Sequence, residues 1–353
     1  MKLKSFSVLG LDIGGANIKA ALLQYQGQKL MTYSVAAKPF EIWQHPDKLS
    51  MLLQELNMEL RGGDVSKIAV TMTAELSDAF RTKREGVICI LNAVKQAFKK
   101  SSIYPFGLDG SFLQLDNAYQ TPLLYAASNW LASAQFLASF YPNCLLIDMG
   151  STTTDIIPIR QGKVISQGRT DLHRLISGEL IYSGILRTNP NAIVTHIPIN
   201  GRSCGVAAEY FTCMADVYLI LGKISPDSYS CPTPDGRAKT VLAAQERLAR
   251  LICADRESIS EKELEKMACY IFEKQLQQIT ESLLLVLSGL QDSFDFSVAL
   301  IGSGHFLTKE VVRRLGLSKI DLNQNDCPWP LAALPAYAVA YLLVQSKDAD
   351  FDD

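Results

Sequence analysis

The chain has 353 residues, of which 48% are hydrophobic and 20% charged, and its formal net charge is −2. This length favours about two domains, each large enough to bury its own core. The charge balance offers no basic excess for binding nucleic acid or an anionic membrane, so neither is an expected partner.

No segment of the sequence is typical of a membrane anchor or a leader. The longest apolar run, residues 331–344, contains Pro335 and falls short of the roughly 20 residues needed to span a bilayer. The N-terminal apolar segment stops at Asp12, which is typical of a first strand and not of a signal peptide. We therefore expect a cytoplasmic protein that acts on small molecules, and we leave a homodimer open.

A tight polar turn between two apolar strands comes first in the chain. Residues 6–23 form this hairpin pattern, and residues 29–37 are expected to add a third antiparallel strand. Glycine lets a backbone approach a ligand closely, and polar turns offer amide groups to anionic oxygens. The turn carries the candidate ligand-binding residues Asp12, Gly14, Gly15, Asn17 and Lys19.

The next segments alternate between helix and strand patterns. We expect a helix over residues 47–60, a buried strand over 67–71 and a helix from Gly86 to Lys99. Glu75 and Asp78 follow the strand, either as cleft carboxylates or as helix N-terminal charges. A cationic run at 81–84 either binds an anionic substrate or lies in a solvated loop.

A further strand is expected over residues 112–115, with Asp116 and Asn117 at its end. Residues 121–139 are predicted to be helical, and their small apolar side chains suit a tightly packed helix between domains. Trp130 on this helix belongs either to the cleft or, as is more usual for tryptophan, to the core.

A second hairpin, over residues 145–159, is the centre of the sequence. Asp148 ends an apolar strand, Asp155 begins the next, and the turn between them is polar. A carboxylate beside phosphate is repulsive unless a divalent cation lies between them, so the pattern predicts Mg²⁺. The alternative, an ordinary hairpin with a hydroxyl-rich turn, is weakened by the earlier copy. The turn of this second hairpin carries the candidate ligand-binding residues Gly150, Ser151, Thr152 and Thr153.

Two Asp-x-Gly hairpins in one chain resemble the superfamily of acetate and sugar kinases, heat-shock ATPases and actin. The resemblance implies an α/β fold in which two ribonuclease-H-like domains enclose a cleft. The sequence Asp-Met-Gly-Ser-Thr-Thr-Thr-Asp at 148–155 is more specific and looks like the hydantoinase/oxoprolinase branch. We place the first domain at 1–141, the second at 142–346 with an insert near 189–296, and an acidic tail at 347–353.

The segment after the second hairpin is rich in charged and hydroxylic residues. A third strand is expected over 162–165, and a helix is expected to begin at Glu179. Arg169 and Arg174 are candidates for binding phosphate or carboxylate, and Asp171 for a base or metal ligand. The alternative is a polar domain edge whose ion pairs stabilise little.

Prolines interrupt the insert, which we expect to hold a helix over 204–222, a tight turn at 231–237 and helices over the Arg247–Arg250 segment and 261–290. On the first of these helices Glu209 and Asp216 would share a face. A zinc site is a minor alternative to unligated residues. Its candidates are His173, His196, Cys204, Cys213 and Cys231.

A buried strand at 297–301 leads into Gly302, Ser303 and Gly304, whose glycines permit close approach of a ligand. In the superfamily this is where the adenosine motif lies; a simple strand-to-helix turn is the alternative. Residues 319–322 are expected to end the sheet and 331–344 to form a closing helix.

Further segments narrow the resemblance to the hydantoinase/oxoprolinase-related family of tetrahydromethanopterin-linked one-carbon metabolism. These segments are residues 11–17, 71–76, 152–155, 169–171, 178–182, 215–218 and 235–236. The resemblance implies a transferase that joins an (aminomethyl)furanylmethyl diphosphate to the phenol oxygen of a glutamyl-tyramine unit in methanofuran or methylofuran biosynthesis.

In that reading the hairpins bind diphosphate and Asp12 and Asp148 hold Mg²⁺. Asp155, Glu75 or Asp171 accepts the phenol proton, while Lys19, Arg169, Arg174 and Glu179 bind substrate. Two rivals stay open. One is an ATP-dependent kinase or hydantoinase/oxoprolinase-type enzyme, with adenosine at residues 302–304. The other is a nucleotide-binding regulator of the actin type.

Overall fold

The first sheet is built on the N-terminal hairpin. The computed structural model describes residues 5–290, 296–320, 322 and 327–348. β1 (Ser5–Ile13), β2 (Asn17–Gln26) and β3 (Lys29–Pro39) form an antiparallel meander. β4 (Lys67–Met72) and β5 (Ser102–Pro105) extend it in parallel from the other edge of β1, giving the order β3-β2-β1-β4-β5.

The second sheet repeats this arrangement. β6 (Cys144–Met149), β7 (Thr154–Arg160) and β8 (Lys163–Val164) form the meander, and β12 (Ser297–Ile301) and β13 (Lys319–Ile320) add in parallel beside β6. A short sixth strand, β9 (Leu180–Ile181), pairs with β7. The shared order confirms the predicted duplicated, ribonuclease-H-like α/β fold.

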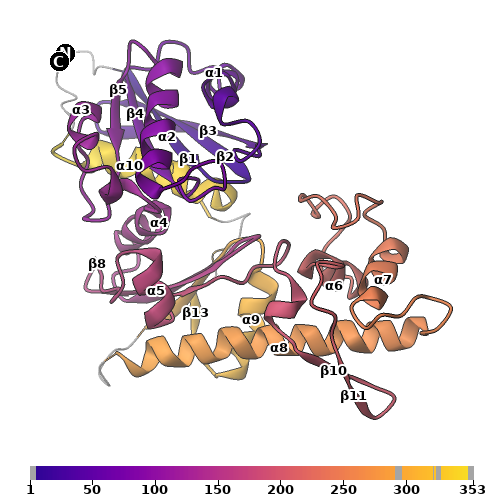
Figure 1. Cartoon of the computed structure of the whole chain (residues 1–353). Helices are drawn as coiled ribbons and strands as arrows, with labels where there is room; N and C mark the ends of the chain where they lie inside the picture. The colour runs from indigo at the N-terminus through magenta and orange to yellow at the C-terminus, as the bar shows by residue number, and fades with distance from the viewer. Residues whose placement is uncertain (1–4, 291–295, 321, 323–326, 349–353) are drawn as a thin grey trace.

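Helices cover both faces of the first sheet (Figure 1). Because successive side chains of a strand point to opposite faces, Leu9 and Leu11 of β1 pack in the cluster with α1 (Leu49–Glu59) and α2 (Lys83–Ala97). Val8 packs in the opposite cluster. The turn η1 (Pro46–Lys48) leads into α1, and the Thr82 hydroxyl caps α2 by accepting from the amide of Glu85 at 3.1 Å.

Two apolar helices, α4 (Asn129–Ala138) and α10 (Leu334–Gln345), join the two sheets. Their buried residues share one cluster with Ala21 of the first sheet and Leu146 of the second, so α4, within the segment predicted to be an interdomain helix, does pack between the sheets. α10 packs on β1, β2 and β4 of the first sheet, although it follows the second sheet in the chain. The proposed domain boundaries themselves stay a prediction.

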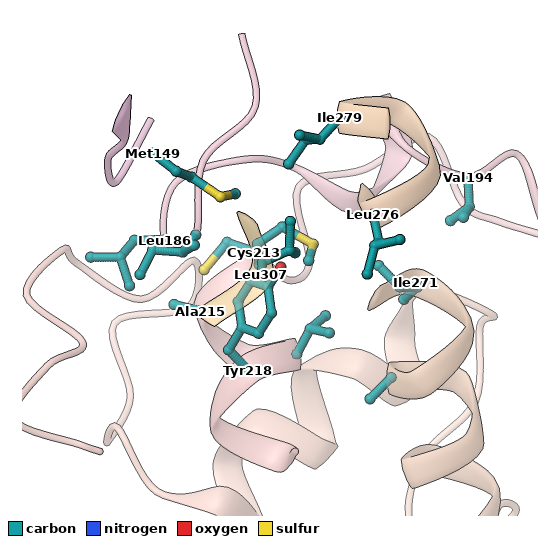
Figure 2. Packing of buried hydrophobic residues seen from close by; sticks show 14 of the residues in the cluster. Met149, Leu186, Val194, Cys213, Ala215, Tyr218, Ile271, Leu276, Ile279 and Leu307 are labelled. Carbon is teal, nitrogen blue, oxygen red and sulfur yellow. The ribbon is translucent and has the colours of Figure 1, made fainter. Parts of the chain in front are cut away.

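The insert extends the second lobe. Figure 1 shows α8 (Glu261–Ser288) running along this lobe, with α6 (Met214–Ile220), α7 (Val241–Arg250) and the hairpin β10–β11 (His196–Ile199, Arg202–Gly205) toward one end. Figure 2 shows Ile271, Leu276 and Ile279 of α8 in one apolar cluster with Tyr218 of α6 and Met149 of β6. The insert is therefore anchored directly on the second hairpin.

A buried ion pair fixes the insert internally. Arg247 and Asp216 are both fully buried, and the guanidinium donates to the carboxylate at 2.6 Å. Asp235, from the predicted tight turn, accepts from Arg247 and from Arg250, each at 3.1 Å. This network ties the turn and α7 to α6.

Some predicted elements are wrong. Residues 112–115 form no strand beyond an isolated bridge from Phe112 to Phe106, and α3 (Leu115–Ala118) follows at once. The predicted helix over 121–139 is interrupted: η2 (Pro122–Tyr125) comes first, then Ala127 adopts a φ of 49°, and α4 begins at Asn129. A positive φ cannot continue a right-handed helix.

The other corrections lie in the second lobe. The helix predicted from Glu179 lies before it, as α5 (Asp171–Ser177), because Gly178 ends that helix in the left-handed conformation. Residues 204–222 contain the end of β11 and only a short α6, so Glu209 and Asp216 share no helix face. η3 (Pro190–Ala192), α9 (His305–Arg314) and η4 (Leu331–Ala333) complete the described elements.

Most of the predicted acidic tail, residues 349–353, lies outside the described residues. Within the part of the chain that is described, no helix combines the length and the apolar character that crossing a bilayer requires.

The contact between β1 and α10 leaves no room for a side chain at Gly10. A Cβ there would overlap the Ala336 carbonyl oxygen and lie 2.9 Å from the Ala340 Cβ. Gly10→Ala should therefore lower the free energy of unfolding by about 1–3 kcal/mol, measured by urea denaturation. Gly205→Ala is the control, since a Cβ at Gly205 has nothing within 4 Å. Equal midpoints for the two variants would contradict tight docking of α10.

Candidate active site

The two hairpin tips have the same turn. The Gly14 amide donates to the Asn17 carbonyl at 3.1 Å, and the Gly150 amide donates to the Thr153 carbonyl at 2.9 Å. Both tips line one cavity of about 460 Å³, which we call the first compartment. Its lining includes the predicted residues Asp12, Gly14, Gly15, Asn17, Lys19, Glu75, Gly150, Ser151, Thr152, Thr153, Asp155, Asp171 and Arg174.

A second compartment, of about 740 Å³, adjoins the first at the hairpin tips. Asn17, Lys19, Gly150 and Ser151 line both. Asp148, Gly302 and Ser303 line only the second, together with His305 and Lys309 at the start of α9. Gly304 does not line it; its amide donates to the Met149 carbonyl at 2.8 Å, and a Cβ there would collide with the Met149 side chain.

A loop that the sequence analysis did not single out holds the second hairpin in place. Thr154 donates through its hydroxyl to the Ser183 carbonyl at 2.7 Å. The Ile185 amide donates to the Gly150 carbonyl at 3.1 Å and the Arg187 amide to that of Ser151 at 3.0 Å. Gly184 is required between them, because a Cβ there would lie 2.7 Å from the Gly150 carbonyl oxygen.

This loop also brings two unpredicted residues, Tyr182 and Arg187, to the first compartment. The Arg187 guanidinium lies 5.1 Å from the ring centre of Trp43, a third unpredicted lining residue. The sequence signals were the place of both residues shortly after the hairpin and, for Tyr182, its position in the 178–182 segment that carries the family resemblance. Nothing in the sequence pointed to Trp43.

Asp12 and Asp148 lie at equivalent ends of β1 and β6. Burial, the Asp155 charge and, to a smaller extent, the Asp12 charge raise the pKa of Asp148 to about 7, while Lys19 opposes the shift. Burial likewise raises the pKa of Asp12, and one of its carboxylate oxygens, Oδ1, is buried without a hydrogen-bond partner in the described structure. Two such carboxylates beside anion-binding turns fit the oxygen ligands that Mg²⁺ prefers.

Asp155 is held by a buried arginine. Arg174 is 1% exposed and donates to Asp155 Oδ1 at 2.9 Å and to the Glu179 carbonyl at 3.0 Å. Its guanidinium stacks 4.0 Å from the ring centre of Trp130, which is buried and also lines the first compartment. Trp130 therefore belongs to both the core and the cleft. Burial raises the pKa of Asp155, and Arg174 counters this shift.

Glu75 and Asp171 lie in the first compartment but differ in their partners. Asp171 forms an ion pair with Lys83 at 3.2 Å, which joins α5 of the second lobe to α2 of the first. Burial raises the pKa of Glu75 to about 7, and its Oε2 has no hydrogen-bond partner within the described structure. Arg81 and Arg84, the other cations of the predicted run, line neither compartment.

Two predicted substrate-binding residues lie elsewhere. Arg169 is exposed and lines neither compartment. Glu179 is buried outside the cleft, where its carboxylate accepts from the Ser166 hydroxyl and the Gln167 amide, each at 2.6 Å, and from the Gly168 amide at 2.8 Å. A carboxylate used in this way anchors the loop before α5 and is not available to a substrate.

The zinc alternative gains no support. Within the described ranges, no group of three or more His, Cys, Asp or Glu residues is arranged to hold a metal ion. Cys213 is instead buried with its Sγ 3.0 Å from the Tyr229 hydroxyl.

Comparison with known proteins gives consistent results. The profile of the hydantoinase/oxoprolinase family matches residues 67–345. The chain is 37% identical over 344 residues to the (4-{4-[2-(gamma-L-glutamylamino)ethyl]phenoxymethyl}furan-2-yl)methanamine synthase of Methanocaldococcus jannaschii, covering 97% of this chain and 98% of that protein. A protein of the same name from Methanococcus vannielii is 33% identical over 213 residues, which is 59% of this chain and 93% of that protein.

Among solved structures, nucleotide-free acetone carboxylase, from a study of ATP-dependent acetone carboxylation, has a TM-score of 0.55 with 12% sequence identity. The match covers 96% of this chain and 70% of that chain. At this identity the similarity concerns the fold.

The buried Glu75 makes the stability of the ligand-free protein depend on pH. Its pKa is about 7 in the folded protein against 4.5 ordinarily, so its contribution is full below pH 4.5 and is lost as the pH rises through 7. The unfolding free energy of Glu75→Gln minus that of wild type should rise by about 3 kcal/mol between pH 4.5 and pH 8, because only the wild-type side chain ionises; urea denaturation measures it. Exposed Glu265 supplies the control variant, Glu265→Gln, which should keep the wild-type pH dependence.

Proposed function

The chain belongs to the hydantoinase/oxoprolinase family, and from this premise we propose that it is a transferase that forms an aryl furanylmethyl ether. It joins an (aminomethyl)furanylmethyl diphosphate to the phenol oxygen of a glutamyl-tyramine unit and releases diphosphate. The observation that carries the proposal is the 37% identity over 97% of the chain to a synthase whose name specifies a phenoxymethyl-furan methanamine. The pathway is methanofuran or methylofuran biosynthesis, for tetrahydromethanopterin-linked one-carbon metabolism in the cytoplasm.

The hairpin tips suit the leaving group. Diphosphate oxygens would accept hydrogen bonds from the turn residues and an ion pair from Lys19, which lines both compartments. Asp12 and Asp148 would hold Mg²⁺ there. Bound Mg²⁺ would neutralise the diphosphate charge and so lower the barrier to its departure.

The two compartments provide space for two organic substrates. Asp148 faces the second compartment, and its cross-strand neighbour Asp155 faces the first. A furanylmethyl group in the first compartment and a phenol entering from the second would meet at the hairpin tips, beside the leaving diphosphate, with the phenol oxygen on the side of the first compartment, which Asp155 lines. The C–O bond to diphosphate breaks, the phenol oxygen bonds to the furanylmethyl carbon, and the phenol loses its proton.

We assign proton acceptance to Asp155. Burial and the Asp155 charge raise the pKa of Asp148, which lies next to the leaving group. The charges that shift the pKa of Glu75 are instead those of Lys83 and Asp171. Asp155 and Asp171 are each paired with a cation, Arg174 and Lys83, so their position and not their pairing separates them. Because Asp155 lies nearest the hairpin tips of the three candidates, it is best placed to take the proton, while Arg174 fixes its orientation.

An ATP-dependent reaction is the second candidate, and the position of Gly302 and Ser303 in the second compartment favours it. A nucleotide there would place its phosphates at the same hairpin tips. An actin-type regulator would bind nucleotide tightly with negligible turnover. Assays with ATP therefore accompany the main test.

The direct test measures diphosphate release by the purified protein with Mg²⁺, the furanylmethyl diphosphate and glutamyl-tyramine. We expect release that requires both organic substrates and yields the ether, and we expect Asp148→Asn to reduce it at least about 100-fold. Asp64→Asn, at an exposed loop residue, is the matched control and should retain activity. Phosphate release from ATP without ether formation would overturn the proposal in favour of the ATP-dependent reaction.

The role of Asp155 has its own test. Asp155→Asn should lower kcat about 100- to 10,000-fold with little change in KM, and Asp171→Asn should lower it less than about 10-fold. Ring-fluorinated glutamyl-tyramine, whose phenol is more acidic, should shrink the Asp155→Asn defect because proton removal then needs less help. An equal defect with both phenols would assign Asp155 a purely structural role.

A further inference from the structure

The first compartment is lined by groups that suit both signs of charge. Lys19 and the turn amides suit an anion. Its lining also includes the carboxylates Glu75, Asp78 and Asp171, which suit a cation. A ligand that fits both sets of groups carries a negative charge and a positive charge.

Among these acidic residues, Glu75 stands apart. Asp171 is neutralised by Lys83 at 3.2 Å, and Asp155, farther along, by Arg174 at 2.9 Å. Asp78 is exposed to water. Glu75 is 1% exposed, lines the compartment and has a carboxylate oxygen with no hydrogen-bond partner in the described structure. Burial raises its pKa and outweighs the Lys83 charge and the Ala127 amide, which favour its ionised form. An ionised, buried carboxylate with one oxygen unpaired is costly, so a cationic ligand here would satisfy it.

We propose that the first compartment contains a binding site for a primary ammonium group, and that Glu75 is the residue that binds it. The inference rests on the proposed function: the ammonium is that of the aminomethyl arm on the furan whose diphosphate lies at the hairpin tips. Glu75 is then a substrate-binding residue, which leaves proton acceptance to Asp155.

The surroundings of Glu75 favour an organic ammonium over a metal ion. Trp43 and Trp130 line the same compartment and provide apolar surface for a planar ring attached to the cation. An ammonium donates three hydrogen bonds and can reach a single buried carboxylate while its ring stays against the indoles.

The site also has a measurable proton linkage. Because burial raises the pKa of Glu75 to about 7, its carboxyl is about half protonated at pH 7 without ligand. An ammonium stabilises the ionised carboxylate and expels that proton. A ligand identical except for a methyl group in place of the aminomethyl arm leaves the proton bound.

The experiment compares these two furanylmethyl diphosphates by isothermal titration calorimetry on the full chain with Mg²⁺, in buffers of different ionisation enthalpy. Wild type should bind the aminomethyl ligand about 10- to 100-fold more tightly than the methyl ligand. At pH 7 it should also release about half a proton more with the aminomethyl ligand. In Glu75→Gln both differences should disappear, leaving the two affinities within about threefold.

Asp78→Asn is the matched control, because it removes an exposed carboxylate from the same compartment, and it should keep the preference for the amine. The inference is overturned if Glu75→Gln keeps the preference and the proton release, or if wild type shows neither. Since binding alone is measured, the result is independent of turnover. Failure of ether formation with the amine preference intact would count against the proposed function and not against the ammonium site.

Discussion

The structure depends on holding buried carboxylates beside two anion-binding turns. In each hairpin the aspartate that ends the first strand pairs across the ladder with the residue seven positions later: Asp12 with Lys19, and Asp148 with Asp155. The first pair is electrically balanced and the second is doubly negative. Lys19 and Arg174 are the cations that limit this repulsion, and the raised pKa of Asp148 shows that burial and like charge still dominate. Such an unbalanced centre is stable only with its cationic and anionic ligands bound or with protons in their place.

The rest of the fold keeps this centre rigid. α4 and α10 fill the space between the sheets, and Trp130 of α4 also stacks against the Arg174 guanidinium. The loop from Ser183 to Arg187 binds the tip of the second hairpin through four main-chain groups, one carbonyl and three amides, and Glu179 anchors the loop before α5. The Lys83–Asp171 pair is a direct ionic contact between the two lobes at the rim of the cleft. A rearrangement of the lobes would therefore break a specific electrostatic link and not only shift an apolar interface.

The sequence was sufficient to predict those elements of the fold that depend on local residue patterns. Both hairpins, the strand at 297–301 and the small-residue interdomain helix could be predicted, because alternating burial, turn glycines and apolar periodicity act over a few residues. Most residues of the candidate site could be predicted because they lie on the two hairpins.

The wrong predictions arise from tertiary contacts that the sequence does not show. Glu179 and Arg169 are as polar as Arg174, and only the packed structure shows that Glu179 satisfies a loop and Arg169 faces solvent. Residues 204–222 have a helical composition, but residues 204 and 205 belong to β11, which pairs with β10, and the helix covers only Met214–Ile220. Trp43 reaches the cleft from a loop with no sequence signal.

The charge pattern of the cleft also bears on which chemistry it can support. A site for the γ-phosphate of ATP and a neutral acceptor needs anion-binding turns, a metal and one base, and gains nothing from a further buried carboxylate. Glu75 adds such a carboxylate to the first compartment, and because burial raises its pKa from 4.5 to about 7, it lowers the stability of the ligand-free protein as the pH rises through this range. Such a group costs the protein little stability if the positive charge of the bound substrate offsets its buried negative charge. A furan with an ammonium on one arm and a diphosphate on the other supplies a cation for Glu75 and an anion for the hairpin turns in one molecule. The presence of both kinds of group in the first compartment is therefore a stronger argument for a bipolar substrate than either hairpin alone.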